Sequence, residues 1–260
     1  MNLDSLNPVA FYIGSWPVSW YGISYSVGIS FAWIYCRRIS GLFGLSRDNI
    51  DQFVTYGILG VVIGGRVGNV LLYYPSYYFS HMSEILKLWN GGMSFHGGLL
   101  GVVVALFIYC ALQKVDIARM ADCISCGAPI GLFFGRVANF VNQELYGRST
   151  DVSWGVVFPK IDLIPRHPSQ IYEALLEGAL LFVIINYFSI FRGFARKNFA
   201  LSGIFFFGYG VFRWVVEYFR EPEEVCSFAK SVTLGQAYSA PLFAIGVGMI
   251  VYAVYSSKKR

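Results

Sequence analysis

Charged residues are scarce in this sequence, since only 13% of its 260 residues are Asp, Glu, Lys or Arg. Soluble domains carry about 25%, and here 56% of the residues are hydrophobic and the mean hydropathy is +0.54. This composition excludes an ordinary soluble domain and predicts an integral membrane protein. The net charge of +5 is not gathered into a basic run on an amphipathic or aromatic surface, so we expect no nucleic-acid partner.

Motifs for metal or nucleotide chemistry are also missing. The sequence contains no HExxH motif, no DxxD-type carboxylate cluster and no P-loop. Its five cysteines are an odd number, and four lie within or at the ends of apolar segments, so no disulfide framework is predicted. The CxxC pair of Cys123 and Cys126 is more typical of small buried apolar side chains than of metal ligands. We therefore expect neither a metal nor a cofactor.

Apolar runs long enough to cross a bilayer recur along the chain. A helix needs about 17 to 25 apolar residues to span it, and the sequence predicts an all-α polytopic membrane protein with seven transmembrane helices. The first 17 residues contain no Lys or Arg, unlike a secretory signal peptide, so we expect the first span to be retained. The predicted spans are 18–36, 52–74, 96–112, 119–141, 169–191, 199–219 and 235–256.

Basic residues between the spans predict the orientation. Eleven Lys and Arg fall in one alternate set of segments and six in the other. By the positive-inside rule this places the N-terminus outside and the C-terminus in the cytoplasm. We expect a single domain over 1–260 with loop insertions on the outer side at about 75–95 and 143–168, the second of which contains a candidate strand from Trp154 to Phe158.

Three arginines, Arg66, Arg136 and Arg213, lie inside predicted spans. Each costs roughly 2.5 to 3.5 kcal/mol at a helix centre on insertion scales, so a functional role is favoured. All three occur late in spans that run outward, and the other polar outliers begin spans that run inward. These outliers are Tyr21, His96, His167, Gln170 and Glu173. The predicted topology therefore gathers them into a site that faces the outer leaflet.

Helical spacing predicts the neighbours within this site, because residues three or four apart share a face. Arg136, Asn139 and Gln143 are expected to line one side of the fourth span. Arg213 and Glu217 are four apart and form either an intrahelical ion pair, a ligand site or both. Glycines four apart predict close helix packing, and they form three sets: Gly127, Gly131 and Gly135; Gly60, Gly64 and Gly68; Gly97 and Gly101.

Arginines and amides at the outer membrane surface suit a phosphate, since guanidinium groups bind its oxygens in bidentate fashion. In a bilayer, such a phosphate indicates a phospholipid headgroup. His96 adds a group that titrates near neutral pH and is able to accept a proton from a nucleophile.

Several motifs together resemble the signatures of the bacterial prolipoprotein diacylglyceryl transferase family. They are Trp20 to Gly22 (WYG), Trp89 to Phe95 (WNGGMSF), His96 to Gly101 (HGGLLG), Gly135 to Arg148 (GRVANFVNQELYGR), Arg166 to Glu173 (RHPSQIYE) and Gly210 to Pro222 (GVFRWVVEYFREP). The resemblance covers almost the whole chain. Ala138 and Gln143 stand where family members often have glycine.

The resemblance implies an enzyme that transfers the diacylglyceryl group of phosphatidylglycerol to the thiol of the lipobox cysteine in a prolipoprotein signal peptide, releasing glycerol phosphate. The implied partners are that lipid, that peptide and membrane lipids, and the implied location is the bacterial inner membrane with the site facing the periplasmic leaflet. Arg136 and Arg213 would hold the phosphate, and His96 would act as general base or orient the attacking group. The matching motifs add further substrate-binding candidates: Tyr21, Asn139, Glu144, Gly147 and Glu217, supported by Arg66, His167 and Gln170.

Two other functions remain open at this point. A transporter for a small anion would use the same arginines, but it needs a polar path through the cytoplasmic half, which contains Asp122 and few other polar groups. An intramembrane serine protease would use Ser94, but no histidine lies in a later membrane helix to activate it.

Overall fold

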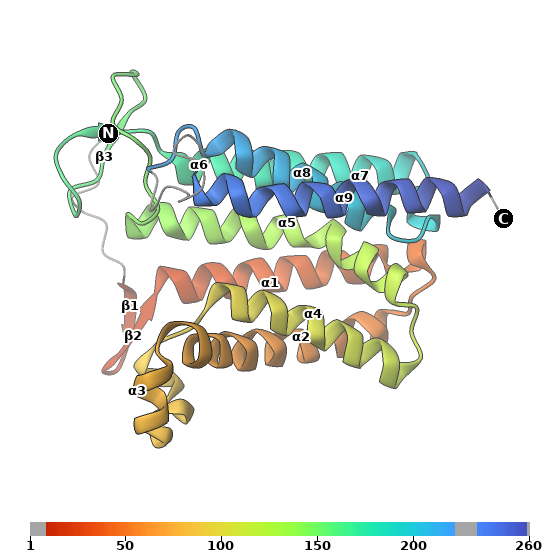
Figure 1. Cartoon of the computed structure of the whole chain (residues 1–260), viewed down its shortest axis with the longest axis horizontal. Helices are drawn as coiled ribbons and strands as arrows, with labels where there is room; N and C mark the ends of the chain where they lie inside the picture. The colour runs from red at the N-terminus through yellow and green to blue at the C-terminus, as the bar shows by residue number, and fades with distance from the viewer. Residues whose placement is uncertain (1–8, 222–232, 259–260) are drawn as a thin grey trace.

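The computed structural model describes residues 9–221 and 233–258, and long helices that run alternately in opposite directions dominate it (Figure 1). Each predicted span coincides with one helical segment of the bundle, called a pass below, and the fifth pass combines two α-helices with a π-helical segment between them. The passes are α1 (Trp20–Ile39), α2 (Arg47–Gly68) with η2 (Asn69–Tyr73), α4 (Phe95–Gln113), α5 (Ile117–Asn142), α6 (Ser169–Glu173) with η5 (Ala174–Leu180) and α7 (Leu181–Phe191), α8 (Ala200–Val216) and α9 (Leu234–Lys258).

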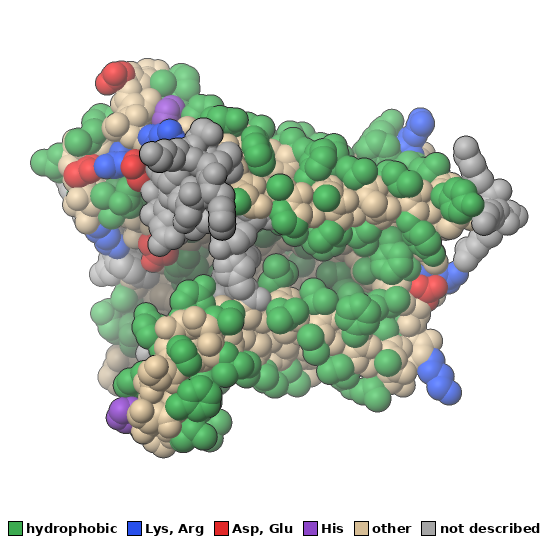
Figure 2. Space-filling view, viewed as in Figure 1, with side chains coloured by type: hydrophobic (Ala, Val, Ile, Leu, Met, Phe, Trp, Pro, Cys, Tyr) green, Lys and Arg blue, Asp and Glu red, His purple; other side chains and the backbone are tan. Residues whose placement is uncertain are grey.

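Four passes are long and apolar enough to cross a membrane: Arg47–Tyr73, Ile117–Asn142, Ser169–Phe191 and Gly235–Ser257. Gly97–Gln113 and Ala200–Val216 form shorter apolar helices. Hydrophobic side chains cover the length of the helices, whereas Lys, Arg, Asp and Glu gather at the two ends (Figure 2). Large apolar side chains such as Phe107 and Val183 point outward, about 60% exposed, which suits a lipid environment. The chain is a mostly helical multi-pass membrane protein.

Short elements cluster at one end of the bundle (Figure 1). β1 (Val9–Ile13) and β2 (Trp16–Ser19) form an antiparallel hairpin. The insertion at 75–95 contains α3 (Pro75–Ser80), η3 (Met82–Leu86) and η4 (Leu88–Asn90). In the second insertion β3 (Val156–Val157) pairs with β4 (Pro165–Arg166), so the candidate strand forms over two of its five residues. At the other end, η1 (Ser40–Phe43) and η6 (Phe194–Arg196) connect the passes.

The glycine faces of α2 and α4 pack against each other as the sequence predicts. A Cβ on Gly60 or Gly64 would overlap the backbone of Gly101 or Gly97, and one on Gly68 would lie 2.7 Å from the Cα of Gly97. Only glycine permits these contacts. The packing prediction is confirmed for this helix pair.

The glycines of α5 behave differently from one another. A Cβ on Gly127 would lie 2.5 Å from Cys36 Sγ on α1. A Cβ on Gly131 or Gly135 would have no atom within 4 Å, although a Cβ on Gly28 of α1 would lie 3.3 Å from the Cα of Gly131. The packing prediction is therefore wrong for Gly135, because the α5 surface at that position faces open space.

Candidate active site

Ion pairs join six side chains where α5, α6, η5 and the end of α8 meet. Arg136 Nε lies 3.2 Å from Glu173 Oε2, and Arg136 Nη2 lies 3.3 Å from Glu177 Oε2. Arg213 Nη1 lies 2.6 Å from Glu173 Oε1, and its Nη2 lies 2.9 Å from Glu217 Oε2. Arg220 Nη1 also contacts Glu173 Oε1, at 3.3 Å. Glu173 thus bridges arginines from two different passes, and Arg213 and Glu217 form the intrahelical pair that their spacing predicts.

The acidic and the basic side chains of this network differ in how deeply they are buried. The side chains of Glu173 and Glu177 are 0% exposed, whereas those of Arg136 and Arg213 are 15% and 13% exposed. The carboxylates are therefore more deeply buried than the arginines, whose side chains remain partly exposed. Buried charges of this kind persist only when they are paired, and an anion that reached the exposed parts of both arginines would meet two cations.

Sequence reasoning missed Glu177 and Arg220 as members of this network. Spacing was the available signal for Glu177, which follows Glu173 by four residues. It gave none for Arg220, which lies beyond the end of α8 at Val216. The π-helical geometry of η5 gave no such signal. π-Helical turns occur often at functional sites, and here one carries Glu177.

Gly178 lets η5 come close enough to α5 for the ion pair between Arg136 and Glu177 to form. A Cβ at Gly178 would lie 2.7 Å from the Cβ of Phe133 and 2.9 Å from its Cα. Phe133 precedes Arg136 by three residues, almost one helical turn. The missing side chain at Gly178 therefore lets the two helices touch directly beside the contact between Arg136 and Glu177.

Tyr21, Asn139 and Glu144 form a second polar cluster. Tyr21 donates from its hydroxyl to Glu144 Oε2 at 3.0 Å, and Asn139 Nδ2 donates to both the Tyr21 hydroxyl and Glu144 Oε2. Gln170 Nε2 donates to the Glu144 carbonyl at 2.6 Å. Side chains from α1, α5 and α6 therefore fix the position of Glu144.

The end of α5 overturns one expectation, that Gln143 shares a face with Arg136. The helix ends at Asn142, and Gln143 adopts a left-handed conformation with φ 61°. Its side-chain Oε1 accepts from Lys160 N at 3.1 Å, which directs it toward the 143–168 insertion. Helical spacing predicts shared faces only within the helix, and Gln143 lies just beyond it.

Gly147 joins the 143–168 insertion to two other segments. Its N donates to the His167 carbonyl at 3.0 Å, and Arg148 N donates to the Phe219 carbonyl at 2.9 Å. A Cβ on Gly147 would lie 2.7 Å from both His167 Cβ and Phe219 O, so glycine is required for this approach. His167 Nδ1 lies 3.1 Å from the Tyr172 hydroxyl. Gly147 and His167 thus fix the loop beside Arg220.

Arg166 anchors the outer part of the same insertion. Its Nη2 lies 2.6 Å from Asp162 Oδ2, and its Nη1 lies 3.0 Å from Glu221 Oε2. Hydrogen bonds from Arg166 lower the pKa of Asp162, and the same hydrogen bonds raise the pKa of Arg166. Both groups therefore stay charged over a wider pH range than isolated side chains.

Arg66 is committed to the 75–95 insertion rather than to the network of Arg136. Its guanidinium donates to five backbone carbonyls, at distances between 2.5 and 3.2 Å, and lies 5.1 Å from the centre of the Tyr78 ring. The five acceptors are the carbonyl oxygens of Glu84, Ile85, Lys87, Gly91 and Gly92. This arrangement folds the loop around one arginine.

The remaining candidates lie at the start of α4. The backbone of His96 is in the first turn of this helix, but its side chain lies outside the described residues. Ser94 caps the helix, since its Oγ accepts from Gly97 N at 3.1 Å. A serine engaged as a helix cap gives no support to a serine protease.

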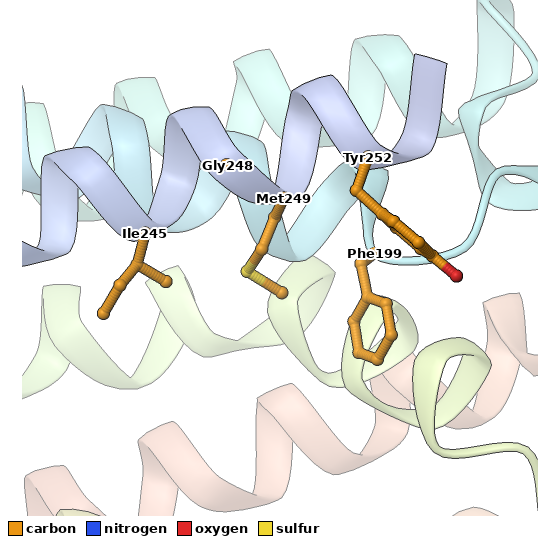
Figure 3. A pocket seen from close by; sticks show the side chains of 5 residues that line it. All are labelled: Phe199, Ile245, Gly248, Met249 and Tyr252. Carbon is orange, nitrogen blue, oxygen red and sulfur yellow. The ribbon is translucent and has the colours of Figure 1, made fainter. Parts of the chain in front are cut away.

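Two surface hollows of the described chain are lined mainly by apolar side chains. One is lined by Phe199 together with Ile245, Gly248, Met249 and Tyr252 of α9, where the Tyr252 hydroxyl is the polar side-chain group (Figure 3). Among residues 9–221 and 233–258, no group of three or more His, Cys, Asp or Glu side chains is arranged to hold a metal ion. The ionic network is therefore the chemically distinctive site of the described chain.

Known proteins are similar to this chain over almost its whole length. The sequence profile of the prolipoprotein diacylglyceryl transferase family matches residues 8–252. A protein of Rickettsia bellii (strain OSU 85-389) is 47% identical over 254 residues, which cover 96% of this chain and 97% of that protein. One from Rickettsia akari (strain Hartford) is 46% identical over 254 residues, covering 96% and 98%. Both are named phosphatidylglycerol–prolipoprotein diacylglyceryl transferase.

Proposed function

The chain belongs to the prolipoprotein diacylglyceryl transferase family, and we propose that it transfers the diacylglyceryl group of phosphatidylglycerol to the lipobox cysteine of a prolipoprotein. The products are a thioether-linked lipid on the peptide and free glycerol phosphate. The observation that carries this proposal is the pair Arg136 and Arg213, which one buried carboxylate holds together and whose side chains remain partly exposed. Such a pair fits the phosphate of the lipid donor.

We place this activity at the periplasmic leaflet of a bacterial inner membrane. In this proposal all seven passes span the bilayer as one transferase domain over 1–260, with insertions at 75–95 and 143–168. The alternating direction of the passes supports this arrangement, as does the excess of Lys and Arg in the connections at the α9 C-terminal end. The network of Arg136 then lies at the outer surface, where a phospholipid headgroup is found.

In the proposed reaction the thiolate attacks the glyceryl carbon that carries the phosphate. A C–S bond forms while the C–O bond breaks, and the phosphate oxygen leaves with the electron pair of that bond. Arg136 and Arg213 stabilise this departing anion. A free thiol has a pKa near 8.5, so it must lose a proton before attack, and His96 is our candidate to accept that proton or to orient the thiol.

The other candidate residues have supporting roles in this proposal. Tyr21, Asn139 and Glu144 offer hydrogen bonds beside the arginines for the glycerol of the headgroup. Glu217 positions Arg213, and Gln170 positions Glu144. Gly147 and His167 hold the 143–168 insertion beside Arg220, and Arg66 holds the fold of the 75–95 insertion.

A small-anion transporter finds no support in the described residues. Such a protein needs a polar path that continues beyond the network of Arg136. The opposite half of the bundle instead contains a core in which Tyr109, Met120 and Leu201 are fully buried. Asp122 in that half is 1% exposed, and its Oδ1 accepts from both N and Oγ of Ser202.

The transferase proposal is tested with purified protein, phosphatidylglycerol and a synthetic lipobox peptide. We expect mass spectrometry to detect the diacylglyceryl thioether and an enzymatic assay to detect glycerol phosphate in equal amount. The cysteine-to-serine peptide is the matched control and should remain unmodified. Failure of folded protein to form the thioether would refute the proposal.

A further inference from the structure

The network of six charged side chains is balanced. Arg136, Arg213 and Arg220 are joined to Glu173, Glu177 and Glu217, so the group carries no net charge when all six are ionised. A site built only to attract an anion would not need so many carboxylates directly behind its arginines. Burial accounts for part of this balance, because buried charges persist only when they are paired, and the reaction supplies a further reason.

The reason we infer, which rests on the proposed transferase function, lies in the charge of the product. The donor lipid is a phosphodiester with one negative charge. The released glycerol phosphate is a monoester, and a second pKa near 6 gives such groups about −1.5 to −2 at pH 7. Uncompensated arginines would hold the product more tightly than the substrate and would slow its release.

Glu177 is the carboxylate with the fewest partners in the network. Glu173 contacts three arginines, and Glu217 contacts Arg213 and also accepts from Thr233 Oγ1 at 2.8 Å. Glu177 contacts Arg136 at 3.3 Å, and its Oε1 has no hydrogen-bond partner among the described residues. Its charge is therefore the least needed for holding the network together.

Its position suits an electrostatic role. Glu177 is 0% exposed, whereas the Arg136 side chain is 15% exposed, so Glu177 contacts Arg136 from the buried side and leaves the partly exposed side of that residue to a phosphate. The direct contact of Gly178 with Phe133 fixes this arrangement. Interactions between charges are strong at such a site, because the effective dielectric constant is far below that of water.

We propose that Glu177 tunes the net charge of the site so that the phosphate-bearing product is released. It acts through Arg136 without touching the substrate, and is a positioning residue in this sense. When the C–O bond breaks, the phosphate gains the bonding electron pair, and the negative charge of Glu177 opposes retention of the resulting anion. Without the negative charge of Glu177, the site would retain the product for longer.

The test is Glu177→Gln, which removes the charge and nearly preserves the shape. We expect the inhibition constant of added glycerol phosphate to fall at least tenfold, equal to about 1.4 kcal/mol. The KM for phosphatidylglycerol should fall by a smaller factor, since that anion carries less charge, and kcat should fall as release becomes slower. Glu177→Asp keeps the charge and should restore an inhibition constant near that of the wild type.

Glu221→Gln is the matched control, because it makes the same change in a side chain that is 47% exposed and paired with Arg166. It should leave the inhibition constant unchanged. If Glu177→Gln does not accumulate as folded protein, Glu217→Gln removes a charge beside Arg213 and should lower the constant likewise.

An inhibition constant that is unchanged or raised in the folded Gln variant overturns the proposal. That result would also follow if Glu177 were protonated in the wild type, in which case it would not tune the charge. Failure of the two proposals is distinguishable. Wild-type protein without transferase activity refutes the proposed function, whereas normal turnover with unaltered product inhibition refutes only the role of Glu177.

Discussion

Replacing Gly178 with alanine tests whether close contact between η5 and α5 builds the site. The new Cβ would lie 2.7 Å from Phe133 Cβ, 2.9 Å from its Cα and 3.1 Å from its N. Two of these atoms are backbone atoms, so rotation of a side chain cannot relieve the overlap. Overpacking costs about 1 to 3 kcal/mol, whereas replacing a helical glycine with alanine gains about 0.5 to 1 kcal/mol. We therefore expect net destabilisation of roughly 0 to 2.5 kcal/mol.

The effect on activity should be larger than the effect on stability. Separation of the two helices would lengthen the 3.3 Å contact between Arg136 and Glu177, and a misplacement of about 1 Å at a reacting centre can reduce the rate about a hundredfold. Thermal unfolding in detergent and the transferase assay measure the two effects. A variant that matched the wild type in rate would contradict the reasoning.

Gly248→Ala is the matched control for this prediction. Gly248 also lies in a helix, and a Cβ there would have no atom within 4 Å. The same glycine-to-alanine change should therefore leave activity unchanged and should raise stability slightly. Loss of activity in this control would show that the assay reports a general disturbance of the helices.

Three further predictions concern the surrounding residues. Arg136→Lys keeps a positive charge beside Glu173 and Glu177 and should remain folded, while its transferase rate with the lipobox peptide falls steeply because bidentate contact with the phosphate is lost; a rate equal to that of the wild type would contradict the role of Arg136. Arg66→Ala should open the 75–95 insertion to limited proteolysis, because five carbonyls lose their donor, and equal protease resistance would contradict this role. The pKa of Asp162 is lowered, so its ion pair with Arg166 persists at the pH of the ordinary aspartate pKa. The pair is lost only as the pH falls through the lower pKa of the folded state. Titration by carboxyl NMR should find Asp162 still ionised at the pH where a free aspartate is half protonated.

The sequence predicts the positions of the passes because each apolar run is long and contains few charged residues. The α2 and α4 glycines were also predictable, since their spacing directly describes a packing face. Topology alone indicated that Arg136 and Arg213 approach the same end of the bundle. These features depend on local pattern and on the direction of each pass, which are both visible in the sequence.

The features that escaped prediction depend on irregular backbone. Glu177 lies in a π-helical segment, whose start the sequence does not mark. Gln143 faces away from Arg136 because it follows the last residue of α5 and adopts a left-handed conformation. Gly135 has the spacing of a packing residue but faces open space, and spacing alone does not reveal where two helices diverge.

The most direct measurement of the central claim is an experimental structure with phosphatidylglycerol bound. We expect the lipid phosphate to lie within hydrogen-bonding distance of the guanidinium groups of Arg136 and Arg213, with Glu173 and Glu177 behind them. A phosphate held elsewhere, for example at Arg66 and the 75–95 insertion, would contradict it.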